Sequence, residues 1–117
     1  MRLKDIIEAI EVEVLAGAEY LPDREVATVS ACDLMSDVLA FAKEHSVLLT
    51  GMVNQHVIRT AQVLDVYCIV FVRGKTPPDD ICELAAETGI TLLTSDHSLY
   101  EACGLLYSKG VSPCSRV

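Results

Sequence analysis

Three short apolar runs, separated by helix-like segments, constrain the fold of this chain most strongly. The runs cover residues 47–50, 67–72 and 90–94. The run at 67–72, Tyr-Cys-Ile-Val-Phe-Val, is apolar throughout, which is typical of a strand buried on both faces of a sheet. Strands that alternate with short helices form βαβ units, and the strands of such units are parallel. The sequence therefore predicts an α/β fold with a mostly parallel sheet flanked by helices.

Periodicity also predicts the remaining elements. Helical spacing and then an alternating stretch indicate a helix and a strand before Gly17. Residues 26–31 alternate and are rich in β-branched side chains, which indicates another strand, and Asp33 is expected to cap a helix that runs to about Ala42. Three later helices are predicted from the apolar stripes at 57–64, 81–85 and 99–106; the second begins at Pro78 and ends at Gly89, and the third is capped by Ser95 or Ser98 and ends at Gly110.

The composition fits one compact domain. The chain has 117 residues, of which 51% are hydrophobic and 22% charged, so it is long enough and apolar enough to bury a core of its own. No linker, low-complexity tract or internal repeat interrupts the pattern. We expect one domain over residues 1–110, followed by a flexible tail over residues 111–117.

The acidic balance of the chain argues against several classes of partner. Nine basic and seventeen acidic residues give a net charge of -8, which repels nucleic acids and anionic membrane surfaces. No apolar run approaches the roughly 20 residues that a membrane-spanning helix needs. The first residues carry acidic side chains in place of an apolar leader. We therefore expect a cytoplasmic protein that binds neither nucleic acid nor membranes.

The five cysteines indicate neither a disulfide framework nor a zinc site. They are odd in number and scattered, with no C-x-x-C pair and no histidine at zinc-finger spacing. Most lie among apolar neighbours and are expected to be small buried side chains. The exception is Cys114, which lies in a polar stretch and is expected to be an exposed thiol. With only three histidines in the chain, no metal site is expected.

The sequence Arg-Gly-Lys-Thr at 73–76 looks like the end of a phosphate-binding P-loop, but it lacks the spacing of that motif. The first glycine of a P-loop would fall at Ile69, in the middle of a strand. In addition, Pro77 and Pro78 remove two backbone donors from the helix start that would hold the phosphates. A nucleoside-triphosphatase site is therefore not expected.

Polar residues follow each of the three apolar strands. The carboxyl ends of strands in an open α/β sheet border the crevice where ligands bind, and helix N-termini there offer free N–H groups to an anion. The same residue types also cap helices, so a ligand site and a simple set of caps both remain open. The candidate ligand-binding residues are Thr50, Gly51, Asn54 and His56 after the first strand, Arg73 and Gly74 after the second, and Thr94, Ser95, Asp96 and His97 after the third.

The stretch 21–37 carries charged residues that could be catalytic or structural. Asp23 and Arg24 could act as a base and a phosphate clamp, or they could form a local salt bridge or turn before a strand. Ser36 and Asp37 fall in the first helical turn, where the helix dipole favours negative charge. A nucleophilic serine would need a nearby base, and none of the histidines is close in sequence. A catalytic triad therefore has little support here.

The sequence resembles the DRTGG domain across almost its whole length. The resemblance rests on L-P-D-R-E-V at 21–26, V-S-A-C-D-L-M-S-D at 29–37, V-L-L-T-G at 47–51, C-I-V-F-V-R-G at 68–74 and I-T-L-L-T-S-D-H at 90–97. That family is an α/β domain similar to the N-terminal domain of HPr kinase/phosphorylase. The family motif corresponds here to Asp23, Arg24, Asp33, Ser36 and Asp37, whereas Ala27 and Thr28 stand where the family often has glycines.

The resemblance implies a regulatory or assembly module. The family recurs beside CBS domains in some pyrophosphatases, and it also occurs at the front of some phosphotransacetylases. Free-standing copies are sometimes encoded beside iron hydrogenases. The catalytic half of HPr kinase/phosphorylase is missing from this sequence, so kinase activity is not implied. We expect a non-catalytic homodimer, or a module docked on a larger metabolic or hydrogenase enzyme, that needs no cofactor and senses an adenine nucleotide or another small anion. A phosphoryl-transfer enzyme or hydrolase and a purely structural scaffold remain the alternatives.

Overall fold

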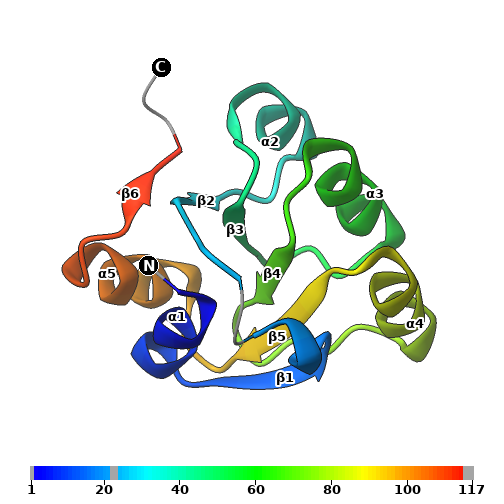
Figure 1. Ribbon diagram of the computed structural model, residues 1–117, viewed down its shortest axis with the longest axis horizontal. Coiled ribbons are helices and arrows are strands. Elements are labelled where there is room, and N and C mark those ends of the chain that lie inside the picture. The colour runs from blue at the N-terminus through cyan, green and yellow to red at the C-terminus, as the bar shows by residue number, and fades with distance from the viewer. Residues whose placement is uncertain (1, 22–23, 115–117) are drawn as a thin grey trace.

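A computed structural model describes residues 2–21 and 24–114 and shows one sheet between two layers of helices (Figure 1). The predicted α/β fold is confirmed. The sheet has six strands in the order β1-β5-β4-β3-β2-β6, and β1 is antiparallel to β5 while the other neighbours are parallel. The strands are β1 Val12–Ala16, β2 Thr28–Ala31, β3 Ser46–Thr50, β4 Cys68–Phe71, β5 Thr91–Ser95 and β6 Ser112–Pro113.

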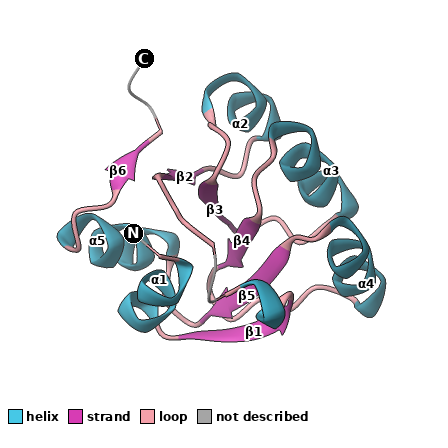
Figure 2. Cartoon of the chain, viewed as in Figure 1, coloured by secondary structure: helices cyan, strands magenta, loops and turns pink. Residues whose placement is uncertain are grey.

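Helices connect the strands and cover both faces of the sheet (Figure 2). Helices α1 and α5 pack on one face, and α2, α3 and α4 pack on the other, each layer with its own apolar cluster. The central strands β3 and β4 are buried at every position, as the continuous apolar runs predicted. The helices are α1 Leu3–Ile10, α2 Met35–Phe41, α3 Gln55–Leu64, α4 Asp79–Thr88 and α5 Leu99–Ser108, with a short 3-10 helix at Ala18–Tyr20. None of the helices among the described residues has the length and apolar character needed to cross a membrane.

The register of the parallel strands brings their carboxyl ends to one edge of the sheet. Ala31 of β2 lies opposite Leu49 of β3, while Thr50 lies opposite Phe71, which in turn lies opposite Thr94. The four loops that follow β2, β3, β4 and β5 therefore begin side by side. This is the edge at which the sequence places most of its candidate ligand-binding residues.

Two of the expected helix caps are confirmed. Ser98 caps α5 in a capping box: the Ser98 hydroxyl accepts from the Glu101 N–H, and the Glu101 carboxylate accepts from the Ser98 N–H, both at 3.2 Å. The hydrogen bond that the Ser98 N–H donates to the Glu101 carboxylate lowers the pKa of that carboxyl. Gly89 ends α4 in the left-handed conformation, with φ of 75°. Helix α5 ends at Ser108, slightly before the predicted Gly110.

The expected capping role of Asp33 is wrong. Helix α2 begins after Leu34, and no side chain caps its first turn. The Asp33 carboxylate instead accepts hydrogen bonds from the neighbouring strand β3 and its loop. Asp33 suggested a cap because it stands just before a helix. Its partner Thr50 is distant in sequence, so the local pattern could not indicate this contact.

The expected flexible tail is wrong for residues 111–114. Val111 and Cys114 are buried, and Ser112–Pro113 between them pairs with Thr28 and Val29 of β2 to form the edge strand β6. The Cys114 thiol lies 2.9 Å from the Thr28 hydroxyl, so the expected exposed thiol is also wrong. Because most residues of this stretch are polar or proline, the sequence pattern did not indicate that Val111 and Cys114 are buried. Residues 115–117 of the predicted tail lie outside the described residues.

Candidate ligand site at the carboxyl ends of the strands

A chain of hydrogen bonds joins the loops that follow β2, β3, β4 and β5. The Asp33 carboxylate accepts from the Thr50 hydroxyl at 2.9 Å and from the Gly51 N–H at 2.7 Å. The Lys75 ammonium donates to the Gly51 carbonyl at 2.8 Å, and the Thr94 hydroxyl donates to the Lys75 carbonyl at 2.7 Å. Side chains from four strand ends therefore hold this edge of the sheet in one arrangement. We call this set of hydrogen bonds the strand-end network, and the edge that it forms the strand-end site.

Gly51 lies between an acid and a base. A Cβ at this position would lie 3.6 Å from both Asp33 carboxylate oxygens and 3.7 Å from the Lys75 ammonium nitrogen. The two opposite charges are thus held beside one short backbone segment, and Lys75 is exposed to solvent. A bound anion would find a fixed cation here, although it would also meet the Asp33 carboxylate.

The loop after β4 has a backbone shape that keeps it close to the loop after β5. Arg73 and Gly74 are both left-handed, with φ of 58° and 65°. The Arg73 N–H donates to the His97 carbonyl at 2.8 Å, and the Gly74 N–H donates to the Ser95 carbonyl at 2.7 Å. A Cβ on Gly74 would lie 2.8 Å from an Asp96 carboxylate oxygen, so glycine is the residue that fits best. The Arg73 side chain remains exposed.

Three of the predicted ligand-binding hydroxyls are buried in the scaffold. Thr50, Thr94 and Ser95 are 0%, 7% and 2% exposed. Thr50 and Thr94 donate within the loop network, while the Ser95 hydroxyl donates to the Ile10 carbonyl at 3.1 Å and accepts from the His97 N–H. These hydroxyls fix the loops through hydrogen bonds within the protein.

The other predicted residues separate into two groups. Asn54 is a helix cap, because its side-chain oxygen accepts from the Val57 N–H at 3.2 Å, and the neighbouring His56 is exposed on the first turn of α3. Gly51, Arg73, Gly74, Asp96 and His97 lie in the joined loops, with the His97 ring 3.7 Å from the Glu101 carboxylate. The structure brings this second group together at the sheet edge.

Lys75 is the residue of this edge that sequence reasoning missed. In the sequence, Lys75 stands out only as part of the Arg-Gly-Lys-Thr stretch, whose spacing does not match that of a P-loop. The usable signal is simpler: a lysine three positions after the end of the apolar strand run at residues 67–72, and two positions after Arg73. At that position a basic side chain reaches the ends of the neighbouring strands whether or not a P-loop is present.

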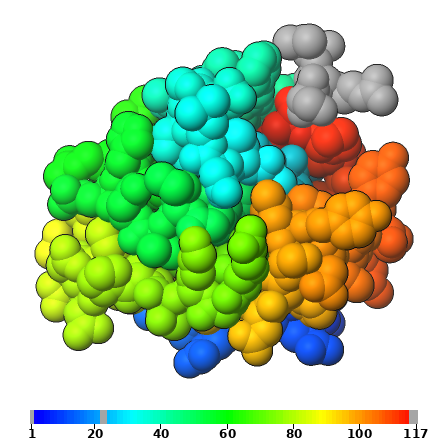
Figure 3. Space-filling model, turned by 180° about the vertical axis from the view of Figure 1, so that it is seen from behind, coloured from blue at the N-terminus to red at the C-terminus, as the bar shows by residue number. Residues whose placement is uncertain are grey.

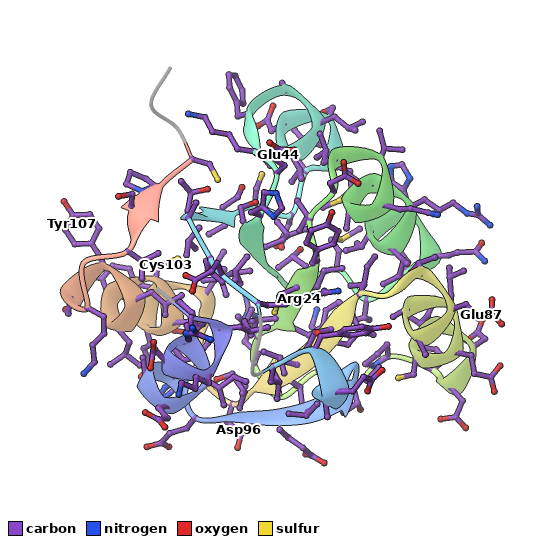
Figure 4. All side chains as sticks on the ribbon, viewed as in Figure 1. Arg24, Glu44, Glu87, Asp96, Cys103 and Tyr107 are labelled. Carbon is purple, nitrogen blue, oxygen red and sulfur yellow. The ribbon has the colours of Figure 1, made fainter. Side chains whose placement is uncertain are left out.

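The family-motif arginine lies at the opposite end of the sheet. The Arg24 guanidinium stacks between the rings of Tyr20 and Tyr67, 4.3 and 4.6 Å from their centroids, and donates to the Tyr67 carbonyl at 2.7 Å (Figure 4). Tyr67 immediately precedes β4, so this contact is at the amino end of the strand. Partial burial lowers the pKa of Arg24. Arg24 is therefore a packing residue and does not reach the strand-end site.

Three of the remaining motif residues belong to the described part of the chain, and one lies outside it. Ser36 and Asp37 are exposed in the first turn of α2, as predicted, and Asp33 belongs to the strand-end network. Asp23, the partner of Arg24 in the motif, lies outside the described residues. Among the described residues, no three His, Cys, Asp or Glu side chains come together as a metal-binding group.

Replacing Asp33 with alanine is expected to lower the free energy of unfolding by about 2 kcal/mol, because the buried Thr50 hydroxyl loses its acceptor. Urea unfolding measures the effect, with the exposed Asp37→Ala as the matched control. In a double-mutant cycle, adding Thr50→Val should remove part of the cost. Equal effects of Asp33→Ala and Asp37→Ala would contradict this role for Asp33.

Comparison with solved structures finds a similar domain in a regulatory protein. The structure is that of the CBS and DRTGG domains of the regulatory region of Clostridium perfringens pyrophosphatase, in complex with its activator diadenosine tetraphosphate. The TM-score is 0.72 at 23% sequence identity, and the match covers 90% of this chain and 45% of that one. At this identity the likeness concerns the fold. This chain spans less than half of the length of that neighbour.

Sequence comparison gives the family. No curated protein matches the chain. The profile of the DRTGG domain, however, matches residues 5–108, a span that runs from within α1 to the end of α5 and so includes the whole strand-end network. The chain therefore belongs to the DRTGG domain family.

Proposed function

We propose that this chain is a cytoplasmic, non-catalytic regulatory module that binds a small anionic ligand, in the first instance an adenine nucleotide, at the carboxyl ends of its strands. The observation that carries the proposal is the pair of exposed cations Arg73 and Lys75 in a loop that hydrogen bonds fix against the neighbouring loops. Such preorganised donors at this edge of an α/β sheet suit a phosphate or carboxylate group.

The charge distribution supports an anion at this position. The whole chain carries a net charge of -8, so two adjacent exposed cations stand out against an acidic surface. Lys75 has three donors, and its contact with the Gly51 carbonyl uses one of them. A phosphate oxygen could therefore bind Lys75 while the loop network remains intact.

The chemistry of the site favours binding over catalysis. Each buried hydroxyl at this edge donates to a fixed acceptor: Thr50 to Asp33, Thr94 to a carbonyl, and Ser95 to a carbonyl. A catalytic hydroxyl must reach both a base and the substrate, and these groups are closed to solvent. A phosphoryl transferase or hydrolase therefore has less support than a sensor.

The similarity to the pyrophosphatase regulatory region supports the choice of ligand class and of partner. That region is complexed with an adenine dinucleotide activator and belongs to a metabolic enzyme. By analogy, we propose that this module acts as a homodimer or docked on a metabolic enzyme, and that ligand occupancy is its signal. A scaffold without a ligand is the second candidate, since many of the predicted polar residues are used in the scaffold itself.

Isothermal titration with AMP, ADP, ATP and diadenosine tetraphosphate tests the proposal. We expect one of these nucleotides to bind, and we expect Lys75→Met to weaken its binding by about ten-fold, because a charge-assisted hydrogen bond is lost while the aliphatic stem is kept. Lys109→Met, which removes an exposed lysine from the end of α5, is the matched control and should leave the affinity unchanged.

Three results would contradict the proposal. Binding that is equally strong in Lys75→Met would move the ligand away from this edge. Nucleotide hydrolysis or phosphorylation of HPr by pure protein would make it an enzyme. A stable dimer by light scattering that binds none of the four nucleotides, and neither pyrophosphate nor acetyl phosphate, would favour the scaffold.

A further inference from the structure

A groove opens at the sheet edge where β6 ends, away from the strand-end network. Within residues 24–114, strand β6 pairs only with Thr28 and Val29, and no described strand pairs with Ser30 and Ala31 of β2 on that side. Helices α2 and α5 stand on the two sides of this gap and leave a cavity of about 370 Å³ between them. In Figure 3 the segments that border the groove, in cyan, red and orange, meet at one side of the molecule. A space of this size is typical of small-molecule sites.

The walls of the groove are mostly apolar. Val29, Leu106 and Val111 contribute aliphatic side chains, and the thiols of Cys32, Cys103 and Cys114 also line it. Burial raises the pKa of the Cys103 thiol, so this thiol remains neutral at ordinary pH. The interior of the groove therefore suits an apolar group.

Two exposed aromatic side chains stand among the lining residues. Phe41, on the last turn of α2, is 59% exposed, and Tyr107, near the end of α5, is 74% exposed (Figure 4). Large aromatic side chains are usually more buried than this when they serve only the core. One ring on each helix gives the groove two faces against which a flat ligand can pack.

Asp37 is the only charged side chain among the described residues that line the groove. It is exposed on the first turn of α2, and Ser30, Tyr107 and Ser112 contribute hydroxyl groups to the lining. Among these described lining residues, an anionic ligand would meet a carboxylate and no cation. A ligand with one positive charge would find its counter-charge beside an apolar wall.

We propose that this groove binds a small organic cation, with an aromatic or aliphatic body between α2 and α5 and one ammonium group at Asp37. The proposal does not depend on the strand-end site, whose cations Arg73 and Lys75 do not line the groove, while the charged residue that lines the groove is a carboxylate. A nucleotide at the strand ends and an amine in the groove would therefore be separate events.

Three matched probes test the proposal on the intact chain. Tryptamine, tryptophol and indole-3-acetate share an indole body and carry a cation, a neutral hydroxyl and an anion. In a titration followed by amide NMR, we expect tryptamine to bind about ten-fold more tightly than indole-3-acetate, with tryptophol between them. The shifted peaks should be those of Ser30, Ala31, Tyr107 and Ser112, which line the groove.

Variants distinguish the contribution of the Asp37 charge to binding from the contribution of the Tyr107 ring. Asp37→Asn should weaken tryptamine binding by about three- to five-fold and leave tryptophol unchanged, since an exposed ion pair contributes modestly. Tyr107→Ala should weaken both probes by about three- to ten-fold through lost ring contacts. Tyr100→Ala is the matched control, because Tyr100 is 88% exposed on the same helix but does not line the groove.

Other results would overturn the proposal. Probes that bind with no preference for the cation, or a preference that survives in Asp37→Asn, would exclude Asp37 as the counter-charge. Shifts confined to the loops around Gly51 and Lys75 would place the amine elsewhere. Shifts of the groove peaks with protein concentration alone would show that a second copy of the chain occupies the groove. Failure of nucleotides to bind would leave these readouts unchanged.

Discussion

Replacing Arg24 with alanine is expected to lower the free energy of unfolding by about 3 kcal/mol, or the melting temperature by about 10 °C. The guanidinium stacks on Tyr20 and Tyr67 and donates to the Tyr67 carbonyl, so alanine removes two ring contacts and a charge-assisted hydrogen bond at once. Tyr20 lies in the 3-10 helix and Tyr67 precedes β4. Arg24 therefore holds the 3-10 helix against the start of the central strand β4.

Urea unfolding monitored by circular dichroism measures this effect, and two variants sharpen it. Arg24→Lys keeps the charge but loses the flat guanidinium, and it should lose more than half of the same stability. Arg59→Ala removes an exposed arginine from α3 and should cost less than ~0.5 kcal/mol. If Arg24→Ala were as mild as Arg59→Ala, the packing role would be wrong. Nucleotide affinity should survive in folded Arg24 variants, because Arg24 lies at the other end of the strands.

Raising the pH from 9 to 11 is expected to destabilise the protein by about 2 kcal/mol through Cys68 alone. Burial raises the pKa of the Cys68 thiol to about 12 from its ordinary 9.0, with the nearby Arg24 acting in the opposite direction. Between these values the unfolded chain loses the thiol proton and the folded chain keeps it. The unfolded state then binds fewer protons, so stability falls as the pH rises. The raised pKa values of Cys82 and Cys103 act in the same direction.

The comparison with Cys68→Ala isolates this contribution from the other groups that titrate at high pH. The variant should lose about 1 kcal/mol at pH 8, because a small cavity forms in the apolar cluster that contains Cys68, but its stability should fall less steeply above pH 9. The measurement is urea unfolding at intervals between pH 8 and 11. Parallel pH profiles for the two proteins would show that the buried thiol does not control alkaline unfolding.

The sequence predicted the central part of the fold because its signals are local. Strands β3, β4 and β5 are buried on both faces, so each is a continuous apolar run whose position does not depend on its neighbours. Strand β6 gave no such signal, since it has two residues and one of them is Pro113. Its existence depends on the edge that β2 offers, and this edge forms only when the chain folds.

The sequence predicted that the loops after the parallel strands meet at one edge, but it did not predict which of their side chains are buried. Parallel strands had to bring their loops to one edge, and Arg73, Gly74, Asp96 and His97 meet there. The burial of the hydroxyls could not be read from the sequence, because a threonine at the end of a fully buried strand looks the same whether it faces a ligand or the scaffold. The role of Asp33 depends on a contact with Thr50 that is distant in sequence.

The position of β1 constrains when this protein can fold during its synthesis. Val12, near the start of the chain, lies opposite Ser95, and the Ser95 hydroxyl also holds the end of α1 through the Ile10 carbonyl. Strand β1 must therefore wait, unpaired, until β5 has emerged from the ribosome. A nascent chain stalled before β5 would expose the apolar faces of α1 and β1, and chaperones would be expected to bind the protein at that stage.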